Sequence, residues 1–500
     1  MIWVWLDFLT SSLEVQKVIQ DLTCSKKELV KYFLDREILI DSEILSRVKS
    51  AESCDELDEI KKELLIGAGA SVKALEIGGA VEIISCYDKE PHKREVQHFV
   101  GYFNARYTAL KAMLMRRQEM QGLTSISRVV ARKEKDNVSI IGLVLDKRET
   151  PNGHIMLTLE DPTGNVKVLI NKNRNDLLAL ARDIVLDETV GIVGVNGDNI
   201  VFANSLLFPD IPMTKELRKS PEEEYAVFIG DFHFGNKEFL KDDFLKFVSW
   251  LKGDTGTESQ RDIASKVKYI FLVGDLVEGV GIYPGQEKDL EIDDIYQQYE
   301  ALTEYIAMIP THMKIIICPG NHDAMRIAEP QPVLYKDFAE SIWKLPNVVL
   351  VSNPAMVNVG KKEGFPGFDV LMYHGFSFPF YADVVKGIRE KGGQDRSDLI
   401  MKFLLQRRHL APMHTSTLYL PDAEKDYLVI DKVPDFFITG HIHRAAIANY
   451  RNITMINCST WIPTSDYQVK LGIKAQPSKV PVVNLRTREA RIMNFGEKES

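Results

Sequence analysis

The sequence has few cysteines, and they form no pattern that binds zinc or builds a disulfide framework. No two of them are spaced as a CxxC motif. An odd and dispersed set is typical of reduced thiols inside a cell. We therefore expect neither a zinc finger nor a disulfide scaffold. The five cysteines are Cys24, Cys54, Cys86, Cys318 and Cys458.

Long apolar runs are absent as well. No uninterrupted run reaches the roughly 18 residues that a membrane-spanning helix needs. The apolar start, Met1 to Leu9, lacks a basic segment and is interrupted by Asp7, so no signal peptide is expected. These features predict a cytoplasmic protein without a membrane partner.

Positive charge is in deficit, with 62 lysines and arginines against 71 acidic residues and a net charge of −9. This balance argues against a protein that coats nucleic acid non-specifically, although a local basic channel stays possible. The composition, 45% hydrophobic and 27% charged, is that of a soluble globular protein. A chain of 500 residues predicts two to four domains.

The first part of the chain predicts helices. Ser25 and Glu28 form a capping box before residues that recur at helical spacing. We expect a helical N-terminal module over residues 1–66, then a linker and a connecting helix over 67–124. The linker begins at Gly67, and the connecting helix runs from Val96 to about Arg117.

Residues 125–212 predict a small all-β domain, because apolar residues there alternate with polar ones. The expected order is three strands, a short helix and two strands, which is the order of an OB-fold barrel. The turn Asp161-Pro-Thr-Gly164 resembles that of nucleic-acid-binding OB domains. A barrel used only for protein docking is an equal alternative. The strands are expected at 138–146, 154–159, 166–170, 189–195 and 200–203, and the helix at 176–183.

A polar segment between Pro209 and Pro221 marks a domain boundary, and residues 222–495 alternate buried strands with helices. Five short motifs in this domain each follow an apolar strand. A strand end delivers its ligands into a cleft shared with neighbouring strands, and imidazole with carboxylate suits a divalent metal. Single motifs of this kind are usually turns, but five in order indicate one site. The motifs are Ile229-Gly-Asp-Phe-His-Phe-Gly235, Gly274-Asp-Leu-Val-Glu-Gly279, Gly320-Asn-His-Asp323, Tyr373-His-Gly375 and Gly440-His-Ile-His443.

The motif set resembles the calcineurin-like metallophosphoesterases, a family of α/β sandwich enzymes. The resemblance implies that Asp231, His233 and His443 hold a first metal, and that Asp275 bridges two metals. It implies that a second metal is held by the remaining three ligands, Asn321, His374 and His441. Two divalent ions are expected, manganese first, with magnesium, iron and zinc as alternatives.

In such a site two divalent ions activate a water that attacks phosphorus in line. The departing oxygen then needs a proton, for which His322 is the candidate donor. The family orients that histidine with a carboxylate three residues after the bridging aspartate, and here this residue is Glu278.

Two features favour a phosphodiester substrate. Gly279 stands where phosphoprotein phosphatases carry an arginine that clamps a terminal phosphate, and Asp323 replaces their glutamate. Between the fourth and fifth motifs lies a basic segment just after several aromatic residues, a combination that suits single-stranded DNA. A solvated helix with an apolar anchor explains this segment equally well. The expected DNA contacts are Arg389, Arg396, Arg407, Arg408 and His409, and the aromatic residues are Phe376, Phe378, Phe380 and Tyr381.

The whole layout, helices then an OB domain then a phosphoesterase domain, resembles the small subunit of archaeal family D DNA polymerase. The stretches 407–412, 471–474 and 479–483 look like that family's C-terminal region. The resemblance implies a 3′-to-5′ proofreading exonuclease that binds primer-template or single-stranded DNA beside a large polymerising subunit. The alternatives are a scaffold with a vestigial metal site, and a free-standing phosphatase or cyclic-nucleotide phosphodiesterase.

Overall fold

The computed structural model of the chain describes residues 81–90, 93–464 and 474–497, together with residues 26, 48–51 and 57. Apart from those isolated positions, the predicted N-terminal helices and the linker from Gly67 lie outside the described residues. The chain divides into two compact units, residues 1–75 and 76–500. Every strand that the structure describes belongs to the second unit.

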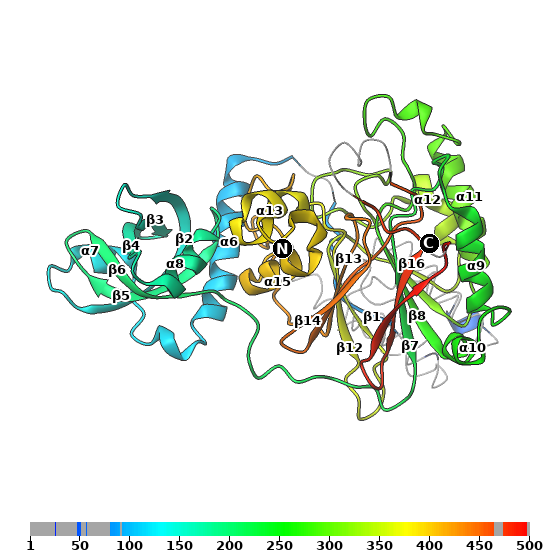
Figure 1. Cartoon of the computed structure of the whole chain (residues 1–500), viewed down its shortest axis with the longest axis horizontal. Coiled ribbons are helices and arrows are strands. Elements are labelled where there is room, and N and C mark those ends of the chain that lie inside the picture. Colours follow the sequence, from blue (N-terminus) through cyan, green and yellow to red (C-terminus); the bar gives the residue numbers. More distant parts are fainter. Residues whose placement is uncertain are drawn as a thin grey trace. The chain divides into compact units, whose positions relative to one another are not determined.

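Two six-stranded mixed sheets form the larger part of this unit (Figure 1). The first sheet has the strand order β1-β11-β12-β13-β15-β14. Its centre is parallel, because β13 runs parallel to both β12 and β15, while the outer pairings are antiparallel. The strands are β1 (Val81–Ser85), β11 (Ala355–Val359), β12 (Phe368–Met372), β13 (Phe436–Thr439), β14 (Ala446–Tyr450) and β15 (Ile453–Asn457).

The second sheet has the order β10-β9-β8-β7-β16-β17, and its first four strands are parallel. These strands are apolar along almost their whole length, as expected for strands buried on both faces. All five residues of β7 are buried, for example. The strands are β7 (Tyr225–Ile229), β8 (Val267–Val273), β9 (Lys314–Cys318), β10 (Val348–Leu350), β16 (Lys479–Asn484) and β17 (Ala490–Asn494).

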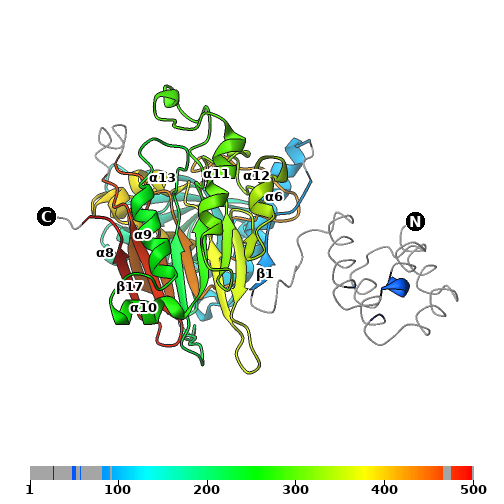
Figure 2. The ribbon, with the colours of Figure 1, turned by 90° about the vertical axis from the view of Figure 1, so that its right-hand side faces the viewer.

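The two sheets pack face to face over a shared hydrophobic core. Phe228 of β7 stacks on Phe271 of β8 at 5.3 Å and meets Phe436 of β13 at 6.0 Å between ring centroids. Four helices cover the outer face of the second sheet (Figure 2), and two longer helices of an insertion after β12 cover the first. This arrangement confirms the predicted α/β sandwich. The helices are α9 (Lys241–Leu251), α10 (Glu258–Ser265), α11 (Ile295–Ala307) and α12 (Lys336–Trp343) over the second sheet, and α13 (Phe378–Val384) and α15 (Ser397–Arg407) over the first, with short α14 (Lys386–Arg389) between them.

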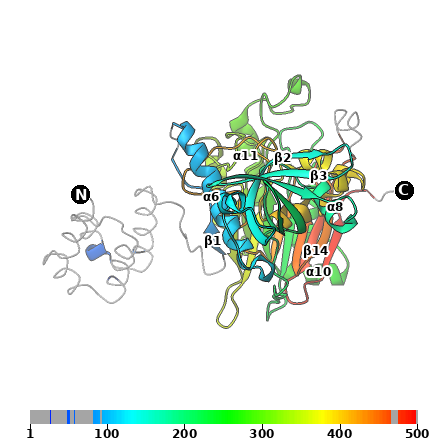
Figure 3. The same ribbon diagram turned by 90° about the vertical axis from the view of Figure 1, so that its left-hand side faces the viewer.

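A separate five-stranded barrel closes in the order β2-β3-β4-β6-β5, and Figure 3 shows β2, β3 and α8 at its near side. Alternate residues of β3, such as Leu157 and Leu159, point into a core that Ile140 and Val168 share. The order of three strands, a helix and two strands agrees with the expectation for residues 125–212. The elements are β2 (Asn137–Glu149), β3 (Ile155–Asp161), β4 (Gly164–Ile170), α8 (Asn175–Arg182), β5 (Thr189–Asn196) and β6 (Ile200–Leu207), preceded by α7 (Ile126–Ala131).

Helix α6 (Val96–Leu114) is the predicted connecting helix, and it contacts both the barrel and the sandwich. Its Tyr107 hydroxyl donates to the Ile141 carbonyl at 3.1 Å, and its Arg106 pairs with Asp426 at 2.7 Å. Strand β1, in contrast, lies in a region for which the sequence predicted no strand. It pairs with β11 at the sheet edge, so tertiary pairing and not a local pattern determines it. Within the described residues, no helix has the length and apolar character to cross a membrane.

Candidate metal centre

The seven predicted ligand residues lie at the carboxyl ends of five strands. Because these strands come from the parallel parts of both sheets, their carboxyl ends meet at one side of the sandwich. The ligands come from loops after β7 (Asp231 and His233), β8 (Asp275), β9 (Asn321), β12 (His374) and β13 (His441 and His443).

Five of the seven ligand residues have a backbone in the left-handed region, with φ between 47° and 68°. Side chains other than glycine rarely adopt these angles, and each costs of order 1–3 kcal/mol unless the surroundings compensate. The strain places ligand atoms from tight loops at a common point. Such clustering of strained residues is typical of functional sites. The five are Asp231, His233, Asp275, His441 and His443.

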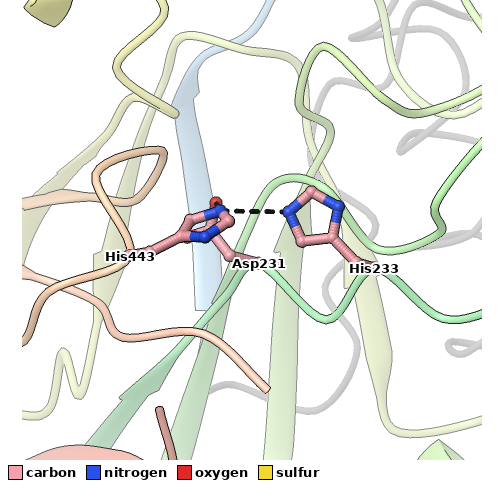
Figure 4. A group of neighbouring side chains, drawn as sticks. All are labelled: Asp231, His233 and His443. Carbon is pink, nitrogen blue, oxygen red and sulfur yellow. Dashed lines mark hydrogen bonds and ion pairs between the residues drawn. The ribbon is translucent and has the colours of Figure 1, made fainter. Parts of the chain in front are cut away.

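The first ligand group consists of Asp231, His233 and His443, whose ligand atoms all lie within 4.8 Å of one another (Figure 4). The two Nε2 atoms of His233 and His443 are 3.1 Å apart, and His443 Nε2 is 3.5 Å from an Asp231 carboxylate oxygen. All three side chains are buried. Two imidazole nitrogens and a carboxylate that converge in this way can hold one divalent ion.

The second group consists of Asp275, His374 and His441, with Asn321 beside it. His374 Nε2 lies 3.2 Å from Asp275 Oδ2 and 3.0 Å from Asn321 Oδ1, while His441 Nδ1 lies 3.3 Å from the same nitrogen. Imidazole, carboxylate and amide oxygen are a ligand set for manganese, iron, zinc or magnesium.

Asp275 connects the two groups through a single atom. Its Oδ2 is 3.2 Å from His374 Nε2 in one group and 3.8 Å from His233 Nε2 in the other. A carboxylate oxygen between two ligand groups is suited to bridge two ions. The other oxygen, Oδ1, accepts a hydrogen bond from the His322 amide at 2.8 Å, which fixes the carboxylate.

Electrostatics at this point favour a cation. Burial tends to raise the pKa of Asp275, but His374, His322 and His233 outweigh it and hold that pKa well below its ordinary value. Burial tends to lower the pKa of His374, whereas the Asp275 carboxylate raises it to about 10. The anionic carboxylate thus attracts positive charge in this pocket. The donor atoms and this charge fit divalent metal ions.

His322 and Glu278 lie beside the first group, but their contacts differ from the prediction. The His322 ring is 4.6 Å from that of His233, and its Nδ1 lies 2.9 Å from the backbone carbonyl of Glu278. The Glu278 carboxylate instead accepts from His233 Nδ1 at 2.9 Å. The main chain of Glu278 therefore orients His322, while its side chain fixes a ligand histidine. The expectation that the carboxylate orients His322 needs this correction.

Two residues that the sequence analysis missed hold Glu278 in place. The Tyr283 hydroxyl donates to Glu278 Oε1 at 2.9 Å, and the Gln286 amide donates to the Glu278 carbonyl at 3.0 Å. Burial tends to raise the pKa of Glu278, but hydrogen bonding and charge from His233 lower it to about 2. The carboxylate is therefore ionised while it holds His233. No local sequence signal marks Tyr283 or Gln286, because both lie in the connection between β8 and α11, where Gln286 begins only a short 3-10 helix.

Asp323, the last residue of the third motif, braces the loops and does not face the ligands. It is buried and accepts from the amides of Gly320 at 2.8 Å and Leu276 at 3.3 Å, and from the Tyr299 hydroxyl at 3.0 Å. Burial and the nearby Asp275 charge raise the pKa of Asp323 to about 6.

Gly279 occupies a position that has no room for a side chain. Its φ is +75°, and a Cβ atom there would lie 2.4 Å from the His322 carbonyl oxygen. An arginine could stand here only if the loop that carries His322 moved. The backbone at Gly279 therefore leaves no space for an arginine that could clamp a terminal phosphate.

Three of the five expected DNA contacts are structural residues. Arg407, Arg408 and His409 are at most 5% exposed. Arg407 pairs with Glu188 of the barrel at 3.1 Å, Arg408 donates to backbone carbonyls, and His409 pairs with Asp426 at 2.8 Å. Their polar atoms already bind groups inside the protein. The expectation that these three residues contact DNA is therefore wrong for this structure.

The other two expected contacts lie nearer the surface. Arg389 is exposed, and Arg396 is half-buried with its guanidinium on Asp398 at 2.8 Å. The amino-acid pattern alone could not separate these two from the buried three, because all five belong to one basic segment around α14 and α15.

Known proteins resemble this chain over most of its length. The sequence profile of the calcineurin-like phosphoesterase family matches residues 226–445. The DNA polymerase II small subunit of Methanothermobacter thermautotrophicus is 38% identical over 463 residues, which cover 90% of this chain and 93% of that protein. The proteins of the same name from Pyrococcus furiosus and Archaeoglobus fulgidus are each 37% identical over 403 residues. They match 80% of this chain, which spans 64% of the Pyrococcus protein and 78% of the Archaeoglobus protein.

These matches run through the barrel as well as the metal centre, so they concern the chain as a whole and not the phosphoesterase layers alone. They confirm the resemblance drawn from the motifs and the domain order. With the strand-end ligands, the sandwich and the shared sequence in agreement, the chain belongs to the DNA polymerase II small subunits and carries a calcineurin-like phosphoesterase domain.

Proposed function

We propose that this centre hydrolyses DNA phosphodiesters and removes nucleotides from the 3′ end, as the proofreading exonuclease of a DNA polymerase. The observation that carries the proposal is the convergence of all seven ligand residues in two groups that share Asp275. Strained ligand backbones support a working site, because five of the seven ligand residues have left-handed φ and gather at this one point.

We assign the ligands to two divalent ions, manganese first, with magnesium, iron and zinc as alternatives. Bound ions would neutralise charge on the phosphoryl oxygens and lower the pKa of a water molecule at neutral pH. The first ion would be held by Asp231, His233 and His443, the second by Asn321, His374 and His441, with Asp275 between them.

The chain's own residues supply the proton and its position. His322 protonates the departing O3′ oxygen, and the Glu278 carbonyl holds the histidine ring at Nδ1 so that Nε2 can face the substrate. The Glu278 carboxylate keeps His233 in its ligand orientation. Gly279 leaves the substrate phosphate without an arginine clamp, which favours a diester over a terminal phosphate.

We infer that the barrel is an OB-fold, on the basis of its closed strand order and the helix between β4 and β5. It serves the polymerase either by contact with single-stranded or primer-template DNA or by protein docking. Exposed Arg389 and half-buried Arg396 remain our candidates for DNA contacts in the insertion.

The second candidate function is a scaffold, because the relatives are named as small subunits. A small subunit implies a large partner, and we propose that this chain docks the polymerising subunit as well as carrying the nuclease. The two functions can coexist in one chain.

The proposal is tested with 5′-labelled DNA that ends in a 3′ mismatch, in manganese, with the chain alone and with its large subunit. Wild type should produce a ladder that shortens from the 3′ end, and His322→Ala should be at least about 100-fold slower, the usual effect of losing a general acid. DNA that stays intact with the assembled wild-type polymerase would reject the nuclease and leave the scaffold.

A further inference from the structure

Phe376 stands directly beside the second ligand group. It follows His374 and Gly375 in the fourth motif, its side chain is half-buried, and its ring meets the His441 ring edge-on. The centroids are 5.6 Å apart at an interplanar angle of 76°. An apolar ring is thus in contact with a ligand histidine in a centre otherwise built from polar groups.

The neighbouring aromatic residues serve the core, and Phe376 does not. Phe378 and Tyr381 are fully buried in the hydrophobic cluster under the first sheet, and Phe380 packs against the same cluster. Within residues 93–464, Phe376 belongs to no such cluster. Its ring therefore contacts the second ligand group through His441 and not the hydrophobic core.

The loop that presents Phe376 is fixed on both sides. The Phe378 amide donates to the Gly375 carbonyl at 2.8 Å and closes a turn around Phe376. The Tyr373 hydroxyl donates to Ser377 Oγ at 2.9 Å, and Ser377 Oγ donates to the Leu410 carbonyl at 2.8 Å. A ring held in advance loses little conformational entropy when a ligand binds it.

Phe376 and His322 contact different ligand groups. Phe376 lies against His441 of the second group, whereas His322 lies against His233 of the first. In 3′-to-5′ hydrolysis the P–O3′ bond breaks, O3′ takes the proton from His322, and the phosphate stays on the terminal nucleotide. The shortened strand therefore departs on the His322 side, and the terminal nucleoside lies nearer the second group.

We propose that Phe376 is the stacking platform for the base of the 3′-terminal nucleotide, the nucleotide that is released. The inference rests on the proposed function and names the substrate feature that the site reads. Every nucleobase has a π-face, so the platform accepts all four bases. A base within a duplex must first break its pairing and its stacking on the neighbouring base. An unpaired 3′-terminal base needs less free energy to reach the ring.

The kinetic test compares Phe376→Leu and Phe376→Trp with wild type in the assembled polymerase. Phe376→Leu keeps an apolar side chain but loses the π-face. The KM for single-stranded DNA should therefore rise about 5- to 150-fold, which corresponds to the loss of one stacked base. Phe376→Trp should restore the wild-type KM. The matched control is Phe338→Leu, a half-buried phenylalanine of α12 whose ring lies on Tyr296 and on no ligand histidine.

A further substrate separates stacking from simple shielding of His441. DNA with an abasic 3′ terminus has no terminal base to stack, so its KM should rise less in Phe376→Leu than the KM of intact DNA does. An equal loss on both substrates, or an unchanged KM for intact DNA, would overturn the stacking role.

A binding measurement keeps the inference independent of turnover. DNA with a 3′-terminal 5-iododeoxyuridine, bound in EDTA and irradiated, should cross-link at Phe376, and the cross-link should be lost in Phe376→Leu. Cross-linking elsewhere in both proteins would reject the platform. If wild type cross-links at Phe376 but cleaves no DNA in manganese, the proposed nuclease fails while the base-binding site stands.

Discussion

At the scale of single residues, the candidate metal centre depends on buried groups outside the seven predicted ligand residues. Glu278 accepts from His233 on its side chain and from His322 on its main chain, so one residue orients both a predicted ligand and the proposed proton donor. Such supporting hydrogen bonds fix the tautomer of a ligand histidine: with Nδ1–H on the carboxylate, His233 Nε2 is the atom left for a metal.

Glu278→Ala should weaken manganese binding and lower the rate about 10- to 100-fold, the usual effect of losing a partner of a ligand histidine. Glu278→Gln should lose less, because the amide oxygen can still accept from His233 Nδ1. Isothermal titration with manganese and DNA cleavage rates measure both effects. Equal, wild-type affinity in the two variants would show that His233 needs no carboxylate.

At the scale of elements, the ligand loops pass so close to one another that glycine is required between them. A Cβ atom on Gly320 would lie 2.3 Å from Asp275 Oδ1 and 2.4 Å from the Asp275 amide, while one on Gly274 would lie 2.2 Å from His374 Nδ1. The loops after β8, β9 and β12 therefore approach one another too closely for a side chain at Gly274 or Gly320. Any side chain at these two positions would displace Asp275 or His374.

Gly320→Ala should abolish cleavage while the sandwich stays folded, because the added methyl group displaces the Asp275 carboxylate that both ligand groups share. Circular dichroism would report the fold and the DNA assay the activity. The control is Gly364→Ala, where no atom lies within 4 Å of the new methyl group. It should cost about 1 kcal/mol of stability from its left-handed backbone and keep wild-type activity. Normal cleavage by Gly320→Ala would contradict the account of this loop.

At the scale of the whole molecule, the sequence predicted the sandwich, the barrel order and a set of candidate ligands that the structure brings together, because each leaves a local signal. Apolar strands followed by Asp, Asn or His predict the candidate metal centre. The alternation of apolar and polar residues predicts the strands of the barrel. The buried roles of Arg407, Arg408 and His409 leave no such signal, because their partners Glu188, Ile430 and Asp426 are remote in sequence. Strand β1 was missed for the same reason.

One of these remote clusters should govern stability in acid. His409 is neutral in the fold, since its Nε2 donates to Asp426 while its Nδ1 accepts from the Ala411 amide at 2.9 Å. Burial, and then the charge of Arg106, lower the pKa of His409 to about 4. An unfolded histidine titrates near about 6.5. The stability that neutral, buried His409 contributes to the fold is therefore complete above about pH 6.5 and is lost as the pH falls toward about 4.

The expected loss is roughly 3 kcal/mol across that window, from about 1.4 kcal/mol per unit of pKa shift. Chemical denaturation of wild type and of His409→Gln at several pH values measures it. The stability difference between the two proteins should shrink as the pH is lowered. A difference that stays constant from pH 7 to pH 4 would mean that His409 does not supply this dependence.

The central claim, that this centre breaks the P–O3′ bond of DNA, is tested most directly by the fate of oxygen from water. The assembled polymerase would act on 3′-mismatched DNA with manganese in ¹⁸O-labelled water, and both products would be analysed by mass spectrometry. The account predicts label on the 5′-phosphate of the released nucleotide and an unlabelled 3′-hydroxyl on the shortened strand. Label on a 3′-phosphate of the strand, or the same rate in His322→Ala as in wild type, would contradict it.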